Sequence, residues 1–198
     1  MKKGYVEIDN KRYHFDEITG RLLNYKDNYG RILFIGDSRT VDMLFNDNDG
    51  IIINELYDDI VVYARHGHGF NYLKETIEEY GLNSFDTLIS WMGANDKGIF
   101  DEYELYYEYL LSLNKNIILC TVGPTKDEYL ESNDYSNNNM KKYNESLINF
   151  SNKYNIHVID LYSYIIDNQI LIKDDGIHYL PKTNYQLLGY IVGDIEKK

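Results

Sequence analysis

The 198-residue chain has one cysteine, two prolines and no long apolar run. Its single thiol, Cys120, excludes an internal disulfide framework and a thiolate zinc site, and its apolar surroundings predict a buried, inert side chain. The longest apolar runs, such as Ile51–Ile53 and Asn116–Val122, have the length of strands. A membrane helix needs about 20 apolar residues, so we expect no membrane insertion.

Basic residues are also few. The chain has 20 Lys and Arg against 32 Asp and Glu, which gives a formal net charge of −12. Nucleic acids and anionic membranes bind basic surfaces, so this charge disfavours both as partners. A neutral small-molecule or glycan ester fits it better, although such a charge also maintains solubility. His66 and His68 lie close together, but a metal site needs three or four ligands and no further cluster is evident, so we expect no metal and no cofactor.

Five short apolar runs alternate with segments that can form helices. The runs are Arg31–Ile35, Ile60–Tyr63, Thr87–Trp91, Asn116–Val122 and Ile156–Asp160. The helical segments are about 39–46, 71–80, 101–114, 138–154 and 183–196. This alternation predicts an α/β fold in which a five-stranded parallel sheet lies between helices on both faces. Ligands of such sheets bind beyond the carboxyl ends of the strands, so we expect the loops after the first four runs to line a site.

Two of these loops carry candidate catalytic groups. The first begins Gly36-Asp37-Ser38-Arg39, and a serine there starts a helix whose N-terminal amides can stabilise an oxyanion. The third reads Gly93-Ala94-Asn95-Asp96, in which Asn95 is a neutral donor of the kind found in oxyanion holes. Taken alone, each pattern is more typical of an ordinary helix cap or turn.

Two further segments complete the set. Gly67, in the loop after the second run, would let a backbone amide approach a substrate closely. Asp175 and His178 are three residues apart, which in a helical turn places both side chains on one face. The carboxylate would then orient the imidazole and leave its other nitrogen for a serine, although a solvated loop histidine is the simpler alternative.

Together, Gly36-Asp37-Ser38, Gly67, Gly93-Ala94-Asn95-Asp96 and Asp175-Gly176-Ile177-His178 resemble the four blocks of the SGNH/GDSL hydrolase superfamily, over residues 29–198. The resemblance implies a flavodoxin-like three-layer α/β/α sandwich. It implies Ser38 as nucleophile, His178 as general base and Asp175 as its orienting carboxylate. It also implies an oxyanion hole formed by the Ser38 amide, the Gly67 amide and the Asn95 side chain, with Gly69 as the alternative to Gly67. Arg39 departs from the pattern, since it replaces the leucine that names the motif.

The resemblance implies a serine ester hydrolase that acts on a small or carbohydrate-linked acyl ester, with an O-acetyl group favoured. A short-chain lipase-like esterase and a non-catalytic cell-wall-binding module are the alternatives. A nucleotide or flavin binder is disfavoured, because residues 36–40 have one glycine and an aspartate and make a poor phosphate cradle. The polar stretch Pro124–Asn139, with Tyr129 and Tyr135, is placed to cover the substrate pocket or to form an ordinary surface loop.

The N-terminal residues 1–28 form a separate segment. Val6–Ile8 and Arg12–Phe15 alternate in polarity across an Asp9-Asn10-Lys11 turn, which predicts a β-hairpin, and Thr19-Gly20 marks a second turn. With Gly4-Tyr5-Val6 and Tyr13-His14-Phe15-Asp16, this segment resembles a single Gram-positive cell-wall-binding repeat. Such repeats generally need about three copies to stand alone, so it is either the end of a longer array or a hairpin packed on the catalytic domain.

The first residues do not read as a secretory signal, because Met1-Lys2-Lys3 is followed by Gly4-Tyr5-Val6-Glu7 and not by an apolar segment. We therefore expect a cytoplasmic protein, or an extracellular, cell-wall-associated one if an export signal precedes this sequence.

Overall fold

A six-stranded sheet forms the centre of the computed structural model, which describes residues 2–8, 11–15, 20, 28–44, 52–57 and 60–196. Five strands run parallel: β3 (Ile32–Gly36), β5 (Ile60–Ala64), β6 (Thr87–Trp91), β7 (Asn116–Cys120) and β8 (His157–Ile159). The order across the sheet is β4-β5-β3-β6-β7-β8. Counted along the chain, the parallel strands have the flavodoxin-like order 2-1-3-4-5. The predicted five-stranded parallel sheet is thus confirmed.

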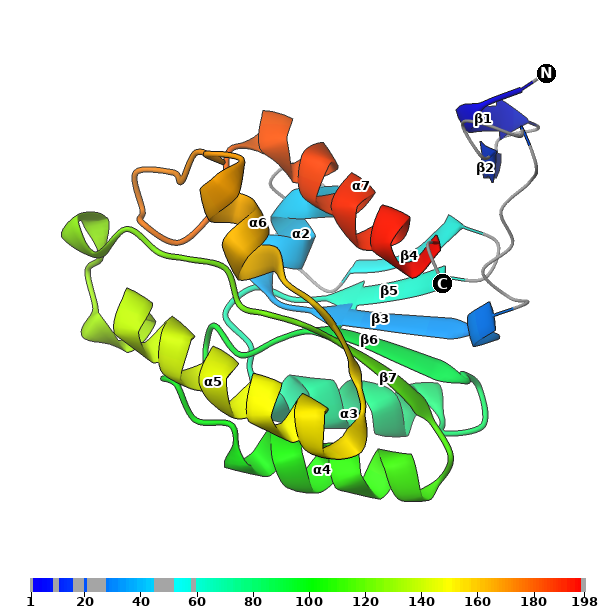
Figure 1. The fold of residues 1–198 in the computed structure, drawn as a ribbon, viewed down its shortest axis with the longest axis horizontal. Helices are drawn as coiled ribbons and strands as arrows, with labels where there is room; N and C mark the ends of the chain where they lie inside the picture. Colours follow the sequence, from blue (N-terminus) through cyan, green and yellow to red (C-terminus); the bar gives the residue numbers. More distant parts are fainter. Residues whose placement is uncertain are drawn as a thin grey trace.

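Helices cover both faces of this sheet (Figure 1). One face carries α3 (Phe70–Tyr80), α4 (Asp101–Ser112) and α5 (Asn137–Tyr154), and the other carries α2 (Ser38–Leu44), α6 (Leu161–Asp167) and α7 (Pro181–Glu196). Two short 3-10 turns, η1 (Asp127–Tyr129) and η2 (Asn133–Tyr135), lie between β7 and α5. The architecture is the predicted three-layer α/β/α sandwich.

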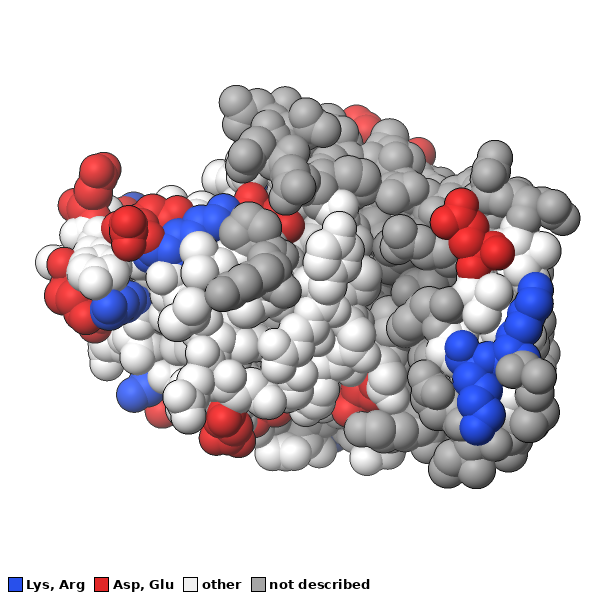
Figure 2. Space-filling model, turned by 90° about the horizontal axis from the view of Figure 1, so that it is seen from above, with Lys and Arg blue, Asp and Glu red and all other residues white. Residues whose placement is uncertain are grey.

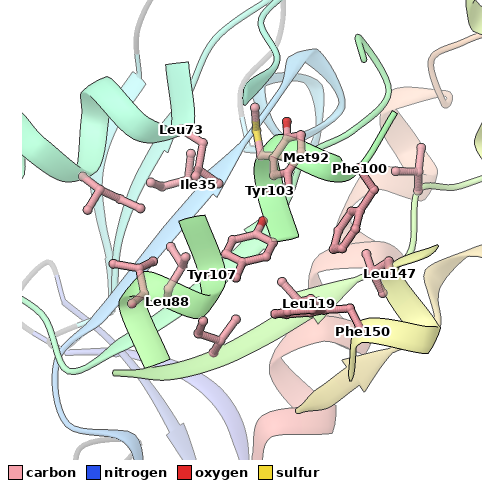
Figure 3. Close-up of a cluster of buried hydrophobic side chains, with 14 of the residues drawn as sticks. Ile35, Leu73, Leu88, Met92, Phe100, Tyr103, Tyr107, Leu119, Leu147 and Phe150 are labelled. Carbon is pink, nitrogen blue, oxygen red and sulfur yellow. The ribbon is translucent and has the colours of Figure 1, made fainter. Parts of the chain in front are cut away.

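Each layer of helices packs on alternate residues of the strands. In β3, Ile32 and Phe34 enter the core under α2, α6 and α7, whereas Leu33 and Ile35 enter the core under α3, α4 and α5. This alternation follows from the two-residue period of a strand. Figure 3 shows the second core, where side chains from both the sheet and the helices meet: Ile35, Leu73, Leu88, Met92, Phe100, Tyr103, Tyr107, Leu119, Leu147 and Phe150. Each fully buried side chain of this kind stabilises the fold by about 1.5–3 kcal/mol.

Two elements were not predicted from the sequence. Strand β4 (Ile52–Tyr57) adds an antiparallel edge next to β5, with a register shift between Glu55 and Tyr57. Helix α6 is only seven residues long and begins where the Asp160 side chain accepts a hydrogen bond from the Ser163 N–H at 3.1 Å. In β4, Asn54 and Glu55 interrupt the apolar pattern, and α6 follows β8 after a single residue, so neither stands out as a separate element in the sequence.

The N-terminal segment forms the predicted hairpin. Strand β1 (Gly4–Ile8) pairs antiparallel with β2 (Lys11–Phe15) in a two-stranded sheet of its own. Figure 1 shows this pair beside the edge of the main sheet that carries β4. The predicted turn residues Asp9, Asn10 and Thr19 lie outside the described residues.

The described surface seen from the α7 side combines uncharged areas with charged side chains of both signs (Figure 2). Acidic and basic side chains lie beside each other at one end of this view. Among the described residues, no helix is both long and apolar enough to cross a membrane. Cys120 is a free thiol with no exposed surface, and burial raises its pKa, which agrees with the predicted inert side chain.

Candidate active site

Ser38 is the first residue of α2, at the carboxyl end of the central strand β3. The N-cap of this helix is Asp37: its side chain accepts a hydrogen bond from the Arg39 N–H at 2.9 Å, and its carbonyl accepts from the Thr40 N–H at 3.0 Å. Capping by Asp37 leaves the Ser38 hydroxyl free for another contact. The first N–H groups of a helix have no partner within the helix, so the Ser38 amide is also available as a donor.

The structure brings Ser38, His178 and Asp175 together. The Ser38 Oγ and the His178 Nε2 are 2.8 Å apart, and the His178 Nδ1 lies 2.8 Å from the Asp175 Oδ2. With the proton on Nδ1 donated to the carboxylate, Nε2 is left to accept the serine proton. The three side chains are thus connected through one imidazole ring, in the arrangement that a nucleophile, a base and an orienting acid require.

Asp175 and His178 lie in a closed turn, not in the helical turn that their spacing suggested. The Lys173 N–H donates to the His178 carbonyl at 2.7 Å, and the Gly176 N–H donates to the Lys173 carbonyl at 3.0 Å. The Asp175 Oδ1 accepts the N–H groups of Ile177 and His178 at 2.8 and 2.9 Å. The expected contact therefore forms through a different backbone, because the carboxylate itself organises the turn.

The electrostatics of the pair favour an ionised Asp175. Partial burial alone would raise the pKa of this carboxyl, but the backbone N–H groups of His178 and Ile177 and the His178 ring hold its pKa below the ordinary value. The side chain of His178 is 22 % exposed and that of Asp175 is 45 % exposed. The imidazole is thus reachable from solvent on one side.

Further contacts that the sequence did not indicate fasten the histidine turn to α2. The Lys173 ammonium lies 2.5 Å from the Asp42 Oδ2, and the Asn184 side-chain amide of α7 donates to the Asp42 carbonyl at 2.6 Å. Asp42 is one helical turn beyond Ser38, so these contacts help to hold Ser38 and His178 in register. They join residues more than 130 positions apart, which no local pattern can indicate.

Asn95 follows β6 and is tied to the loop after β5. Its side-chain Nδ2 donates to the His68 carbonyl at 2.9 Å, and its Oδ1 lies 3.4 Å from the Tyr135 hydroxyl, which donates to it. One N–H of the amide is thereby used to orient the side chain, and the second remains for a ligand. Tyr135 belongs to η2, so the loop between β7 and α5 reaches the predicted site.

The two glycines of the loop after β5 differ in their surroundings. Gly67 has φ +67°, a conformation that favours glycine, and a Cβ there would meet no atom within 4 Å. A Cβ on Gly69 would lie 2.2 Å from the Asp96 Oδ1, so Gly69 is required for close packing. Of the two candidate donors, Gly67 is the one with open space around it.

Asp96 links this loop to the helices below the sheet. Its carboxylate accepts the Phe70 N–H at 3.0 Å and the Tyr103 hydroxyl at 2.9 Å, and burial raises its pKa. Beside it, a hollow of about 220 Å³ is bordered by Asn95, Phe70, Glu102 and other residues. The fourth residue of the Gly93–Asp96 block thus acts in packing, and the hollow beside it is lined by neither Ser38 nor His178.

The part of the chain that the structure describes contains no group of three or more His, Cys, Asp or Glu side chains able to hold a metal ion. In the pair considered from the sequence, the His68 Nδ1 lies 2.6 Å from the His66 carbonyl oxygen.

Comparison with solved structures identifies the fold. No protein-family model matches the sequence, and no curated protein matches it. A lipase/acylhydrolase from Enterococcus faecalis superposes with a TM-score of 0.65 at 18 % identity, over 84 % of this chain and 96 % of that chain. A protein from Parabacteroides merdae described as a GDSL-like lipase gives 0.63 at 18 % identity, over 84 % and 95 %. An acetylxylan esterase from Geobacillus stearothermophilus gives 0.60 at 19 % identity, over 85 % and 94 %. The chain therefore has the α/β/α fold of these GDSL-type lipases and acylhydrolases.

Proposed function

We propose that the chain is a serine ester hydrolase that works through an acyl-enzyme on Ser38. The observation that carries the proposal is the continuous hydrogen-bonded chain from the Ser38 Oγ through His178 to Asp175, with both imidazole contacts at 2.8 Å. These three side chains lie at the carboxyl end of the sheet, beside the point where the strand order reverses. Folds of this kind bind their ligands there.

In the first step, His178 accepts the Ser38 proton through Nε2 as the Oγ attacks the ester carbonyl. Asp175 keeps the other nitrogen protonated and stabilises the imidazolium that forms. His178 then gives its proton to the leaving alcohol, and the acyl group remains on Ser38. In the second step, His178 removes a proton from water as the water attacks the acyl-enzyme. His178 then returns this proton to the Ser38 Oγ as the acyl–Oγ bond breaks and the acid leaves.

The developing oxyanion needs fixed donors. We assign this role to the backbone amides of Ser38 and Gly67 and to the free N–H of Asn95. The in-register pairing of Gly36 with both Ala64 and Trp91 supports this assignment, since the three loops start from one level of the sheet. One such donor typically contributes about 3–4 kcal/mol to stabilising the transition state.

For the substrate, we favour a small neutral ester, with a carbohydrate O-acetyl group first. The formal charge of −12 disfavours anionic substrates. Two acetylxylan esterases are among the proteins of similar fold. A short-chain acyl ester is the second candidate, because lipases and acylhydrolases share the fold as well.

For the N-terminal hairpin formed by β1 and β2, we propose a separate role in binding. Its resemblance to a cell-wall-binding repeat suggests a role in holding the hydrolase near cell-wall glycan. Cosedimentation of the whole chain with purified cell walls, compared with a chain starting at residue 29, tests this role. Equal binding by both would contradict it.

The test of the proposed function is hydrolysis of a chromogenic acetyl ester by wild type and by Ser38→Ala. We expect the variant to lose at least about 10³-fold in kcat, since the nucleophile is removed. Ser112→Ala, an exposed serine in the last turn of α4, is the matched control and should keep the wild-type rate. Equal rates for wild type and Ser38→Ala would refute the proposal.

A further inference from the structure

Tyr135, in the short turn η2, reaches the candidate oxyanion donor from a distant part of the chain. Its hydroxyl donates to the Asn95 Oδ1 at 3.4 Å, although the two residues are 40 positions apart. The Tyr135 ring is partly buried and packs against the core under α3, α4 and α5. A phenylalanine would make the same packing contacts, so packing gives no reason for the hydroxyl.

The orientation of the Asn95 amide is determined by its two partners. The His68 carbonyl oxygen only accepts hydrogen bonds, so the NH₂ group of Asn95 must face it, at 2.9 Å. The Oδ1 then faces Tyr135, whose hydroxyl is able to donate. Together the two contacts fix the plane of the amide, and with it the direction of the second N–H.

The turn η2 meets the Asn95 turn at a second point. The Lys97 ammonium pairs with the Asp134 carboxylate at 2.9 Å, and Asp134 directly precedes Tyr135. Lys97 has φ +54°, a conformation that residues with a side chain rarely adopt. Both partners of this ion pair are exposed, so the pair contributes little stability by itself. Its effect is to set η2 and the Asn95 turn side by side.

Side chains also brace η2 from within. The Ser132 Oγ accepts a hydrogen bond from the Asp134 N–H at 3.2 Å. The Asn139 side-chain amide donates to the carbonyls of Asn133 and Asp134 at 3.2 and 3.0 Å. Bonds of this kind from Ser and Asn side chains stabilise turns. Tyr135 is therefore carried by a turn of defined shape.

The same connection, between β7 and α5, contacts the turn of His178. The Lys126 N–H donates to the Gly176 carbonyl at 2.8 Å, and a Cβ on Gly176 would lie 2.7 Å from the Lys126 carbonyl oxygen. One segment thus joins the His178 turn to the Asn95 turn, and Tyr135 is its point of contact with Asn95.

We propose that Tyr135 is a positioning residue for the oxyanion hole: its hydroxyl orients the Asn95 amide so that the free N–H is aimed before substrate binds. The inference rests on the proposed function, since it concerns a donor to the oxyanion of ester hydrolysis. Fixed donors stabilise a transition state well because they do not reorganise during the reaction. Donation to the Oδ1 also polarises the amide, which makes its N–H a stronger donor.

The test is a double-mutant cycle made of Tyr135→Phe, Asn95→Ala and the double variant. Tyr135→Phe keeps the ring and removes only the hydroxyl. We expect kcat on a chromogenic acetyl ester to fall about three- to tenfold, as for the loss of one ordinary hydrogen bond, with KM nearly unchanged. In the Asn95→Ala background, the same change should leave kcat unaltered, because no amide remains for the hydroxyl to orient.

Tyr154→Phe is the matched control. Tyr154 is the last residue of α5, and its hydroxyl donates to the Glu108 Oε1 at 2.5 Å. This change also removes one tyrosine hydroxyl and one hydrogen bond, but at the far end of a helix of 18 residues. We expect its kcat and KM to match those of wild type.

NMR spectroscopy of the side-chain amides gives a second readout that needs no activity. The NH₂ signals of Asn95 are identified by their loss in Asn95→Ala. They should move in Tyr135→Phe, because the hydrogen bond to the Oδ1 is removed, and they should stay in place in Tyr154→Phe.

An unchanged kcat in Tyr135→Phe would overturn the inference. A loss that persists in full in the Asn95→Ala background would overturn it as well, because the hydroxyl would then act on the substrate or on the fold and not through Asn95. In both cases the wild-type activity still upholds the proposed function. A wild type that hydrolyses no ester would instead overturn the proposed function. The NMR signals then decide whether Tyr135 orients Asn95, and unmoved signals in Tyr135→Phe would overturn that claim too.

Discussion

Replacing Asp175 by Asn removes one charge and leaves the shape of the side chain. Asp175 accepts three hydrogen bonds, two from backbone N–H groups at one oxygen and one from the His178 Nδ1 at the other. An asparagine keeps both backbone bonds if its oxygen takes the first position. Its NH₂ group then faces the Nδ1 at 2.8 Å, where two donors would meet. The imidazole escapes this conflict by moving its proton to Nε2, where it can no longer accept the Ser38 proton.

The wrong tautomer removes the general base while the turn stays intact. In serine-protease triads this change lowers kcat by about 10⁴-fold, and each tenfold step corresponds to about 1.36 kcal/mol. Because Asp175 is more exposed than a fully buried triad aspartate, we expect a loss of about 10³–10⁴-fold, or about 4–5.5 kcal/mol. Tm should change little, since the backbone bonds of the turn persist.

The assay is kcat and KM on a chromogenic acetyl ester at pH 7, with Asp174→Asn as the matched control. Asp174 is the exposed neighbour, and its substitution changes the net charge equally. We expect the control to match wild type. A kcat for Asp175→Asn within about threefold of wild type would refute the reasoning, because a base of the wrong tautomer cannot support such a rate.

Three further outcomes follow from the described contacts. Asn95→Ala should lower kcat by about 10²–10³-fold with KM little changed, measured by steady-state kinetics, because an oxyanion donor acts mainly in the transition state; a change in KM alone would contradict this role. Gly93→Ala should lower Tm strongly, because Gly93 has φ +116° and a Cβ would lie 2.2 Å from the Tyr143 ring. Gly189→Ala, in α7 with open space around it, should instead stabilise the protein by up to about 1 kcal/mol. Thermal unfolding of both variants and wild type tests these opposite changes in stability. Asp86→Asn should lower Tm at neutral pH, because hydrogen bonds from Arg31 lower the pKa of the Asp86 carboxyl to about 2. The stability that the ionised carboxylate contributes is present above its unfolded pKa and is lost as pH falls towards its folded pKa. The difference in Tm between wild type and Asp86→Asn, measured by thermal unfolding, should therefore narrow as pH falls from about 5 towards 2.

The sequence predicted the strands and helices whose apolar residues recur with a clear period. The five parallel strands and five of the helices were expected close to where they lie, because their apolar runs have a clear period: α2, α3, α4, α5 and α7. Strand β4 was missed because Asn54 and Glu55 interrupt its apolar pattern, and helix α6 because it follows β8 after a single residue. The Asp160 cap was a usable signal for α6, since Asp160 and Ser163 have the spacing at which a side chain caps a helix.

For the candidate site, the sequence indicated which side chains meet but not what holds them. Ser38, His178 and Asp175 lie together as expected. The capping of α2 by Asp37 and the contact of Lys173 with Asp42 depend on the tertiary arrangement. The prediction of a helical turn around Asp175 was wrong. The Asp175 carboxylate accepts the N–H groups of Ile177 and His178, and it thereby folds these residues into a loop that is not helical.

The most direct test of the central claim is the reaction of the protein with a fluorophosphonate, followed by mass spectrometry of the intact chain and its peptides. This reagent captures a serine only when a base activates it. We predict one adduct per chain, on the peptide that contains Ser38, with a large loss of labelling in Asp175→Asn. A chain that stays unlabelled, or an adduct on a different serine, would contradict the account.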